Sequence, residues 1–409
     1  MSSIGSEIKK ACVSFIKNWF YVKKEEGIFL TGATGFLGAF LLQELLEQTD
    51  SKIYCLVRPK RNMKAQQRLI ETMKYYYLWK DAYISRIEVL VGDLAKPNLG
   101  LSDDQFNTLA GKIDSIYHVG AYVNFIYSYE ALEPTNVGGT DEILRLATLK
   151  KVKPVHYTSS MNVFSLKDIE NSTIVYEDSF PSLKESTDTT GDKMPRELKL
   201  LGLGYLQTKR VSERHIKSAR SRGVQVNIYR VGRISGHSKT GACQTNDFFW
   251  RTVKASIPIG KWPDVGALID FIPVDYTCKV IVHIARRSKI IGKNFHLFNR
   301  ESFPHVQVID CIKRQGYAVE LCTYEEWLGR MKQKVRKTSE RAAYSMAPME
   351  PQSGDVFAGV YYDDGNTREA LKGSGIVCPP VDQKLLDIYF DYFKAIGYFD
   401  TPNTIEQQT

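Results

Sequence analysis

The chain has 409 residues, of which 43% are hydrophobic and 25% charged, a composition that excludes a globally disordered protein. Its 55 basic and 46 acidic residues leave a net charge of +9, which favours an anionic partner but is too diffuse to name one. No apolar run approaches the roughly 20 residues that cross a bilayer, so we expect a cytoplasmic protein that does not enter the membrane.

The seven cysteines are scattered along the chain and form no C-x-x-C pair. This spacing indicates neither a zinc site nor a disulfide framework, so we predict reduced structural thiols and no metal. His118, His156 and His296 lie in or beside predicted strands without partners at metal-ligand spacing. We interpret these three residues as packed, hydrogen-bonded histidines.

The first 26 residues are predicted to form a short amphipathic helix and a linker, because apolar residues recur there at helical spacing. From Gly27 onward, short apolar strands alternate with helical segments. The predicted strands cover residues 27–31, 52–57, 86–91, 115–119 and 154–158, and the predicted helices include residues 40–46, 64–79 and 130–149. Nearly all-apolar strands that alternate with helices are typical of a parallel sheet covered on both faces. We therefore predict a doubly wound, Rossmann-like α/β fold.

The alternation fades after about residue 300. We predict a nucleotide-binding domain over residues 27–300 and a smaller, mostly helical substrate-binding lobe over residues 301–409. Residues 166–203 are rich in polar side chains, which indicates an exposed insertion or mobile loop.

Two conspicuous clusters have simple structural explanations. The aromatic residues between Tyr75 and Trp79 are interpreted as helix packing rather than as a surface for stacking bases, and we expect no nucleic-acid partner. Lys150, Lys151 and Lys153 are interpreted as a solvated turn, with a contact to an acidic carrier protein as the alternative.

A glycine-rich turn, T-G-A-T-G-F-L-G, directly follows the first predicted strand and directly precedes a helix. In this context, Gly32 and Gly35 let the backbone approach a pyrophosphate, while Gly38 lets the helix pack against the strand. The helix N-terminus presents free N–H groups and a positive dipole end to the phosphates. The candidate cofactor-binding residues of this turn are Thr31, Gly32, Thr34, Gly35, Phe36, Leu37 and Gly38.

The end of the second strand indicates which dinucleotide binds. Sites that prefer NAD usually carry an acidic residue there, whereas this strand ends in Arg58, followed by Lys60 and Arg61. A guanidinium matches a 2′-phosphate, so we predict that Arg58 binds this group and that the cofactor is NADPH. For some of these three residues, a solvated basic surface is the alternative.

A Y-x-x-x-K pair, Tyr205 and Lys209, lies on one face of a predicted helix. A lysine ammonium beside a tyrosine favours the phenolate, so we expect Lys209 to lower the pKa of Tyr205. The fifth strand ends in T-S-S-M-N-V, which places hydroxyl groups at the carboxyl edge of the sheet, where the active sites of α/β proteins lie.

These features resemble the extended short-chain dehydrogenase/reductase superfamily. Within it, the chain is most similar to the terminal thioester reductase domains of nonribosomal peptide synthetases and of carboxylic acid and aminoadipate reductases. The resemblance covers about residues 27–402. It rests on T-G-A-T-G-F-L-G at Thr31, C-L-V-R at Cys55, G-D-L at Gly92, H-V-G-A at His118, N-V-G-G-T at Asn136, S-S-M-N-V at Ser159, G-Y-L-Q-T-K at Gly204, Y-R-V-G-R-I-S-G at Tyr229, P-V-D-Y at Pro273, F-H-L-F-N at Phe295 and C-P-P-V-D at Cys378.

The resemblance implies roles for further residues. Asp93 and Leu94 are expected to line the adenine pocket, and Gly120 and Ala121 to lie along the cofactor. Ser160 falls where the family places its catalytic Ser or Thr. Many relatives have Ser-Thr at this point and this chain has Ser-Ser, so Ser159 stays an alternative. Asn136 is expected to support the helix beside the cofactor or simply to begin a helix.

By this resemblance, the expected reaction is the NADPH-dependent reductive release of an acyl or peptidyl thioester from a phosphopantetheine carrier domain. The product is an aldehyde, with reduction to the alcohol left open. Ser160, Tyr205 and Lys209 form the expected catalytic set, and the protein is expected to act as a monomer.

Three alternatives remain open. Two are enzymes of the same superfamily, a fatty acyl-CoA reductase and a nucleotide-sugar epimerase or dehydratase. The third is a non-catalytic NADP-sensing regulator, which would not need Ser160, Tyr205 and Lys209 together.

Overall fold

Seven parallel strands form the central sheet of the computed structural model, which describes residues 26–60, 62–164, 174–181, 203–287, 290–337, 361–400 and 402. The strand order is β12-β7-β5-β4-β1-β2-β3, and every neighbouring pair is parallel. The strands are β1 (Gly27–Thr31), β2 (Lys52–Val57), β3 (Ile87–Val91), β4 (Ser115–His118), β5 (Val155–Ser160), β7 (Val226–Val231) and β12 (Asn294–Leu297). The predicted α/β fold is confirmed. The expected N-terminal helix and linker lie outside the described residues, as does most of the segment 166–203.

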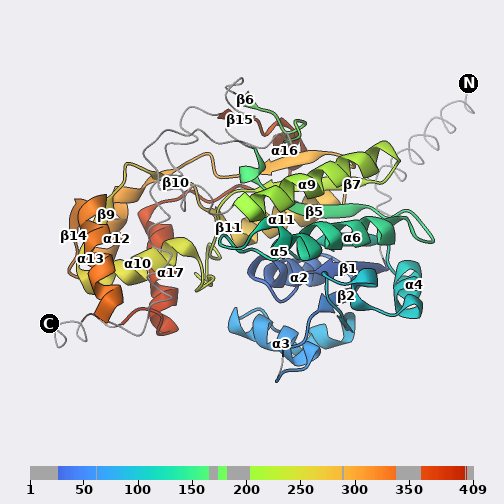
Figure 1. Ribbon diagram of the computed structural model, residues 1–409, viewed down its shortest axis with the longest axis horizontal. Coiled ribbons are helices and arrows are strands. Elements are labelled where there is room, and N and C mark those ends of the chain that lie inside the picture. The colour runs from blue at the N-terminus through green and yellow to red at the C-terminus, as the bar shows by residue number, and fades with distance from the viewer. Residues whose placement is uncertain are drawn as a thin grey trace, which may run out of the picture.

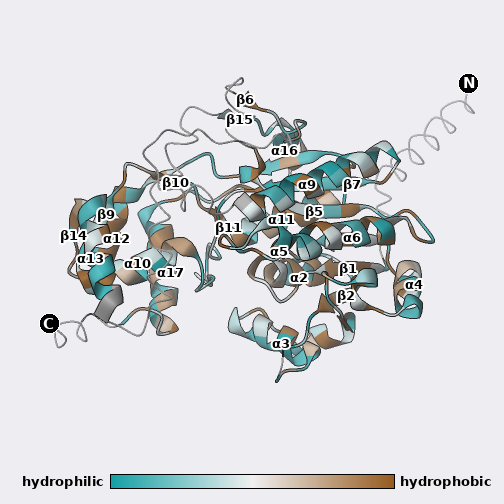
Figure 2. Ribbon diagram, in the orientation of Figure 1, coloured by the Kyte–Doolittle hydropathy of each residue, from teal (hydrophilic) through white to brown (hydrophobic). Residues whose placement is uncertain are grey.

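Helices cover both faces of the sheet (Figure 1). Ile28 and Leu30 pack into the cluster formed with α2 and α11, whereas Phe29 packs into the opposite cluster. This division follows from the strand geometry, because successive side chains point to opposite faces. One face carries α2 (Phe36–Gln48), α3 (Ala65–Tyr75) and α11 (Val274–Ala285), and the other carries α4 (Asp103–Lys112), α6 (Gly139–Thr148) and α9 (Leu203–Ser221). In Figure 2, β1 and β2 are coloured as hydrophobic, as expected for strands buried on both faces.

The single helix predicted over residues 130–149 is interrupted. It consists of α5 (Tyr129–Glu133), a π-helical turn over Pro134–Gly138, and α6. Pro134 has no N–H to donate, and its carbonyl accepts a hydrogen bond from the N–H of Gly139, five residues later. This turn places Asn136, which is buried, beside the functional site described below.

A group of smaller elements lies beside the central sheet. It contains α10 (Phe248–Ser256), β9 (Lys261–Asp264), β10 (Leu268–Ile269), β13 (Phe303–Pro304), α12 (Val308–Arg314), β14 (Glu320–Thr323), α13 (Tyr324–Lys337) and α17 (Gln383–Ala395). Contacts within this group cross the expected domain boundary at residue 300, because β9 pairs with β14 and β10 pairs with β13.

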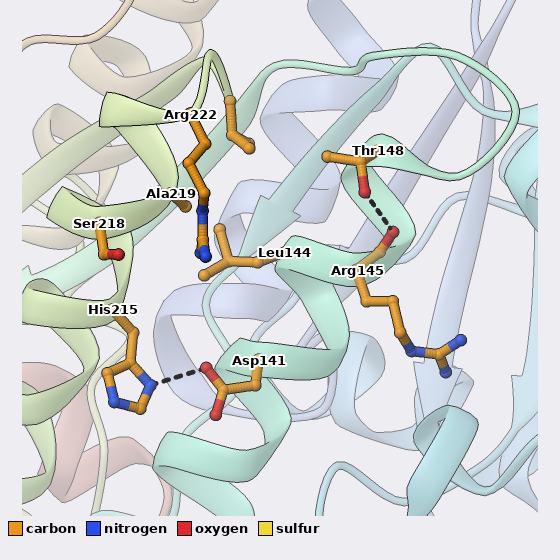
Figure 3. Close-up of a pocket in the computed structure, with 9 residues that line it drawn as sticks. Asp141, Leu144, Arg145, Thr148, His215, Ser218, Ala219 and Arg222 are labelled. Atoms are coloured by element: carbon orange, nitrogen blue, oxygen red, sulfur yellow. Dashed lines mark hydrogen bonds and ion pairs between the residues drawn. The ribbon is translucent and has the colours of Figure 1, made fainter.

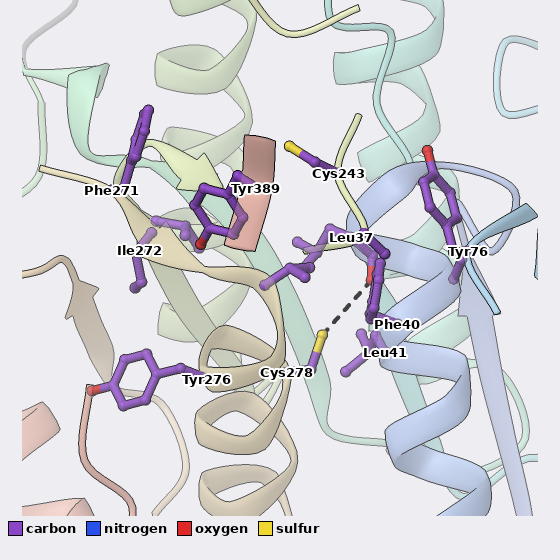
Figure 4. Close-up of a cluster of buried hydrophobic side chains, with 14 of the residues drawn as sticks. Leu37, Phe40, Leu41, Tyr76, Cys243, Phe271, Ile272, Tyr276, Cys278 and Tyr389 are labelled. Carbon is purple, nitrogen blue, oxygen red and sulfur yellow. Dashed lines mark hydrogen bonds between the residues drawn. The ribbon is translucent and has the colours of Figure 1, made fainter. Parts of the chain in front are cut away.

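Several contacts join residues after 300 to the central domain. The hydroxyl of Tyr389 on α17 donates a hydrogen bond to the carbonyl of Gly236 and lies 2.8 Å from the hydroxyl of Ser235. Figure 4 shows Tyr389 in the same apolar cluster as side chains of α2 and α11, including Leu37 and Cys278. These contacts make one continuous apolar core from the two parts of the chain.

A second junction is formed by Glu177, whose buried carboxylate faces the start of α16 (Gly365–Leu371). It accepts hydrogen bonds from the N–H of His296 at 2.7 Å, the N–H of Asn366 at 2.5 Å and the hydroxyl of Thr367 at 2.6 Å. Nearby, β6 (Ile174–Val175) pairs with β15 (Tyr361–Tyr362). Glu177 therefore links α16 to the edge strand β12.

The prediction of a solvated turn was wrong for Lys153, whose side chain is fully buried. Its ammonium donates hydrogen bonds to the carbonyl oxygens of Leu146, Leu149 and Lys151 at 2.9, 2.7 and 2.8 Å. These carbonyls lie at and just beyond the end of α6, where backbone acceptors lack helical partners. Burial lowers the pKa of Lys153 to about 8.

Two classes of feature are absent from the described parts of the chain. No helix there is both long and apolar enough to cross a bilayer. No group of three or more His, Cys, Asp or Glu side chains there is arranged to hold a metal ion.

Candidate active site

The glycine-rich turn joins β1 to α2 at the carboxyl edge of the sheet. Gly32 has φ +79°, and a Cβ at this position would lie 2.7 Å from the backbone nitrogen of Gly120. A Cβ on Gly38 would lie 2.0 Å from the carbonyl oxygen of Gly32. Both positions therefore require glycine. The N-cap of α2, Gly35, is exposed and supplies no side-chain cap, which leaves the first N–H groups of the helix for a phosphate.

The side chains of this turn have separate roles. The centres of the Phe36 and Tyr76 rings lie 5.3 Å apart, and Leu37 is buried in the core, so Leu37 offers only its backbone to a ligand. Thr34 is half-buried at the tip of the turn. The structural interpretation of the aromatic cluster holds for Tyr76, which is buried, but not for Tyr75 and Tyr77, which are 45% and 70% exposed, and α3 ends at Tyr75.

Thr31 and His118 tie β1 to β4 beneath the turn. The Thr31 hydroxyl lies 2.8 Å from Nδ1 of His118 and accepts a hydrogen bond from the N–H of Gly120 at 3.0 Å. The other ring nitrogen of His118 lies 3.2 Å from the Thr140 hydroxyl. Burial, together with the charge of Lys209, lowers the pKa of His118 to about 3. The prediction of a packed, hydrogen-bonded histidine is confirmed for His118, which is neutral.

The ends of β2 and β3 bring the predicted adenine and phosphate residues together. Arg58 is 62% exposed, and its guanidinium lies 3.7 Å from the carboxylate of Asp93. The side chain of Leu94 packs against Gly120, where a Cβ would come within 2.7 Å of it. Ala121 follows Gly120 and is half-buried. One site thus contains Arg58, Asp93, Leu94 and the glycine turn.

Sequence reasoning missed Arg68, which lies on α3 beside Arg58. Its guanidinium donates a hydrogen bond to the carbonyl of Arg58, and burial together with the charge of Arg58 lowers its pKa. Two guanidinium groups therefore flank the end of β2. No local motif marks Arg68. It lies ten positions after Arg58, and the two residues come together only because the chain folds back at the start of α3.

Lys209 lies buried under the end of β5. Its ammonium donates hydrogen bonds to the carbonyl of Thr158 at 2.8 Å and the hydroxyl of Tyr157 at 3.3 Å, and it lies 4.7 Å from the centre of the Tyr157 ring. Burial lowers the pKa of Lys209 to about 8, opposed by the charge of Glu213.

The expectation that Lys209 lowers the pKa of Tyr205 was wrong for this arrangement. Burial raises the pKa of Tyr205 well above its ordinary value, and the ammonium of Lys209 is engaged by Tyr157 and Thr158. The Tyr205 hydroxyl therefore keeps its proton at neutral pH. Its ring lies 5.7 Å from that of Phe125, edge to face.

The two candidate serines differ in their surroundings. Ser160 is half-buried, and its Oγ accepts a hydrogen bond from the N–H of Asn162 at 3.2 Å, which leaves its own proton available to a ligand. Ser159 is buried, and its Oγ has no hydrogen-bond partner among the described residues. The accessibility of Ser160 favours it as the group that contacts a substrate.

Asn136 connects the loop after β4 to the helix that carries Tyr205 and Lys209. Its side-chain oxygen accepts a hydrogen bond from the N–H of Tyr122 at 2.7 Å. Its amide donates to the carbonyl of Tyr122 and to the hydroxyl of Thr208, at 3.2 and 3.0 Å. Asn136 therefore supports α9, the first of the two roles expected for it.

A buried ion pair, which was also not predicted from the sequence, joins α9 to β7 one turn beyond Lys209. Glu213 lies four residues after Lys209, and its carboxylate accepts hydrogen bonds from Arg230 on β7 at 2.7 and 3.0 Å. The Arg230 guanidinium also donates to the carbonyls of Glu177 and Ser179. The only sign of this pair in the sequence is that Glu213 follows Lys209 at the same four-residue spacing that separates Lys209 from Tyr205.

A cavity of about 630 Å³ opens elsewhere, between α6 and α9 (Figure 3). Its lining includes Arg222 and also Asp141 and His215, whose carboxylate and ring Nδ1 are hydrogen-bonded at 2.7 Å. His215 and Arg222 lie on α9 and just beyond its end, away from Tyr205 in the first turn of the helix. The cavity therefore does not belong to the candidate active site.

Comparisons with known proteins identify the family. Residues 30–281 match an NAD-binding family described as "Male sterility protein". A crystal structure of the terminal R domain from the myxalamid PKS-NRPS biosynthetic pathway is 37% identical, with a TM-score of 0.80, and the match covers 92% of this chain and 93% of that one. The chain belongs to the terminal reductase-domain family. The binding of a nicotinamide dinucleotide follows from this membership and from the glycine turn.

Curated relatives of this reductase domain are much longer than it is. It is 40% identical over 379 residues to a linear gramicidin synthase of Brevibacillus parabrevis, a match that covers 91% of the reductase domain and 7% of the synthase. It is 30% identical over 397 residues to the L-2-aminoadipate reductase large subunit of Penicillium chrysogenum, covering 92% and 28% of the two chains. The similarity thus spans nearly all of the reductase domain and a minor part of each relative.

Proposed function

We propose that this reductase domain uses NADPH to reduce an acyl or peptidyl thioester held on the phosphopantetheine arm of a carrier domain, and so releases an aldehyde. The observation that carries the proposal is the position of Ser160, Tyr205 and Lys209 at the carboxyl edge of a sheet that also carries the glycine turn. The 37% identity to a terminal R domain over nearly the whole chain supports it.

The residues at the glycine turn fit the proposed cofactor. The turn and the uncapped start of α2 suit a pyrophosphate. Arg58 and Arg68 supply two guanidinium groups at the end of β2, where an NAD site usually carries an acidic residue, and we assign them to the 2′-phosphate. Asp93 and Leu94 are assigned to the adenine pocket and Lys209 to the nicotinamide ribose.

NADPH, when bound, supplies a hydride. The protonated hydroxyl of Tyr205 and the free proton of Ser160 donate hydrogen bonds to the thioester oxygen as negative charge develops on it. Lys209, charged below about pH 8, stabilises that charge from beneath the site. Overall, the thioester gains one hydride and one proton. Collapse of the hemithioacetal then breaks the C–S bond and yields an aldehyde and a free thiol.

The first test mixes the protein with NADPH and an acyl-pantetheine thioester, and follows the nicotinamide absorbance together with the products by mass spectrometry. We expect oxidation of NADPH and the appearance of an aldehyde, or of an alcohol if a second NADPH is used. Tight NADPH binding without oxidation, for free thioesters and then for a carrier-bound chain, would contradict the proposal.

The proposal also covers the binding partner of the enzyme, its oligomeric state and its location in the cell. The partner is a phosphopantetheinylated carrier domain, and the elements after residue 300 contribute to the acyl channel and to the docking surface for that domain. We further propose that the protein acts as a monomer in the cytoplasm. Light scattering of the purified protein gives its molar mass, which tests the monomeric state. The same measurement with the carrier domain added tests whether the two bind.

A further inference from the structure

The loop between β4 and α5 exposes an unusual concentration of apolar side chains. Within the six residues 122–127, here named the apolar loop, five large side chains are each 39–60% exposed to solvent: Tyr122, Val123, Phe125, Ile126 and Tyr127. Single exposed apolar residues are normal on protein surfaces, but a contiguous group marks a place where another molecule binds.

The apolar loop is held in a defined conformation by polar contacts. The side-chain oxygen of Asn124 accepts hydrogen bonds from the N–H groups of Ile126 and Tyr127, at 2.8 and 3.1 Å. Asn136 bonds both backbone groups of Tyr122. Because these hydrogen bonds hold Tyr122 to Asn136 and fix the turn around Asn124, the loop presents its apolar side chains without having to be ordered by a ligand.

The apolar loop also packs directly against the first turn of α9. A Cβ on Gly204 would lie 2.4 Å from the carbonyl oxygen of Tyr127, so only glycine permits this approach. The next residue is Tyr205, whose ring lies edge to face against Phe125 at 5.7 Å. The exposed apolar surface therefore begins next to Tyr205, the residue that we assign to bind the thioester oxygen.

We infer that the apolar loop contacts the acyl group of the thioester and makes the enzyme prefer acyl groups whose first carbons are apolar, aliphatic or aromatic, over small or charged ones. This inference rests on the proposed function, because it places the acyl carbons beside the carbonyl that Tyr205 binds. Each methylene buried against the loop is expected to raise kcat/KM by about fourfold at most, the factor that corresponds to its transfer from water.

The test compares acetyl-, butyryl- and hexanoyl-pantetheine with the wild-type protein and the variants Phe125→Ala and Ile126→Ala. The matched control is Ile84→Ala. Ile84 is also exposed, at 43%, but it precedes β3 and so lies at the amino ends of the strands, away from the apolar loop. We expect the wild type to prefer hexanoyl over acetyl. The two loop variants should lose about five- to tenfold in kcat/KM for hexanoyl, with less than about a twofold change for acetyl and for the KM of NADPH.

The possible outcomes separate this inference from the proposed function. Reduction of the thioesters with an unchanged chain-length preference in both loop variants contradicts the inference alone. An equal loss for acetyl and hexanoyl also contradicts it, because it would indicate a general structural role. If the wild type reduces no thioester, the proposed function fails and the inference fails with it.

Discussion

At the scale of single residues, the site combines groups whose pKa values are shifted by burial. Tyr205 is held protonated and Lys209 has a pKa of about 8. The Tyr–Lys spacing predicted that both residues share one helical face, but it did not predict where the ammonium points. That direction depends on Tyr157 and Thr158, which belong to β5, some fifty residues earlier in the chain.

Replacing Tyr205 by Phe removes the proposed hydrogen-bond donor and leaves the ring. We expect kcat for thioester reduction to fall by about 10²-fold or more, while the Kd for NADPH changes little. Steady-state kinetics and a fluorescence titration with NADPH measure the two quantities. Turnover at the wild-type rate would exclude Tyr205 from the mechanism.

Lys209 gives the reaction a predicted pH dependence. The ammonium is charged below its pKa of about 8 and loses its proton above it, so the rate of reduction should fall as the pH rises through about 8. Single-turnover rates between about pH 6 and 10 test this. In Lys209→Arg, whose guanidinium keeps its charge, the fall should vanish whatever the absolute rate. A flat profile in the wild type would contradict the role of Lys209.

Cofactor preference is predicted to depend on Arg58. Arg58→Ala should raise the Kd for NADPH by about tenfold or more and alter that for NADH much less, because only NADPH carries the 2′-phosphate. Arg222→Ala is the control, since this arginine is exposed and lies just beyond the end of α9. An equal loss for both dinucleotides would remove Arg58 from the phosphate site.

At the scale of elements, the strands found from the sequence are the apolar ones. β7 was not among the predicted strands; Asn227 and Arg230 interrupt its apolar pattern, as Asn294 and His296 interrupt that of β12. All four side chains are buried and hydrogen-bonded to other parts of the chain. Hydropathy cannot reveal a strand whose polar residues are satisfied only by tertiary contacts.

The ion pair between α9 and β7 is predicted to be important for stability. Arg230→Met leaves the carboxylate of Glu213 buried without its partner, so the free energy of unfolding should fall by about 3–5 kcal/mol. The same substitution at Arg145, which pairs with Glu142 at the surface, should cost less than about 1 kcal/mol. Urea denaturation of the wild type and the two variants gives both values, and equal losses would contradict the argument.

At the scale of the whole molecule, local sequence signals located the nucleotide-binding half better than the rest. The glycine turn, Arg58 and the Tyr–Lys pair each lie within a few residues of a recognisable strand or helix. The pairing of β9 with β14 joins segments about 60 residues apart, and Glu177 meets Asn366 and Thr367 across some 190. Local hydropathy patterns carry no information about such long-range contacts, so the domain boundary predicted at residue 300 did not account for them.

The junction at Glu177 has a practical consequence for anyone who dissects this enzyme. A fragment ended near residue 300 would contain the glycine turn and the Tyr–Lys helix, and by motif content it would look complete. It would nevertheless lack the N–H of Asn366 and the hydroxyl of Thr367 that bond Glu177, and the α17 side chains that belong to the same apolar core as Leu37 and Cys278. We therefore expect such a fragment to be less stable than the full chain, because buried groups of the nucleotide-binding segments have their partners after residue 300.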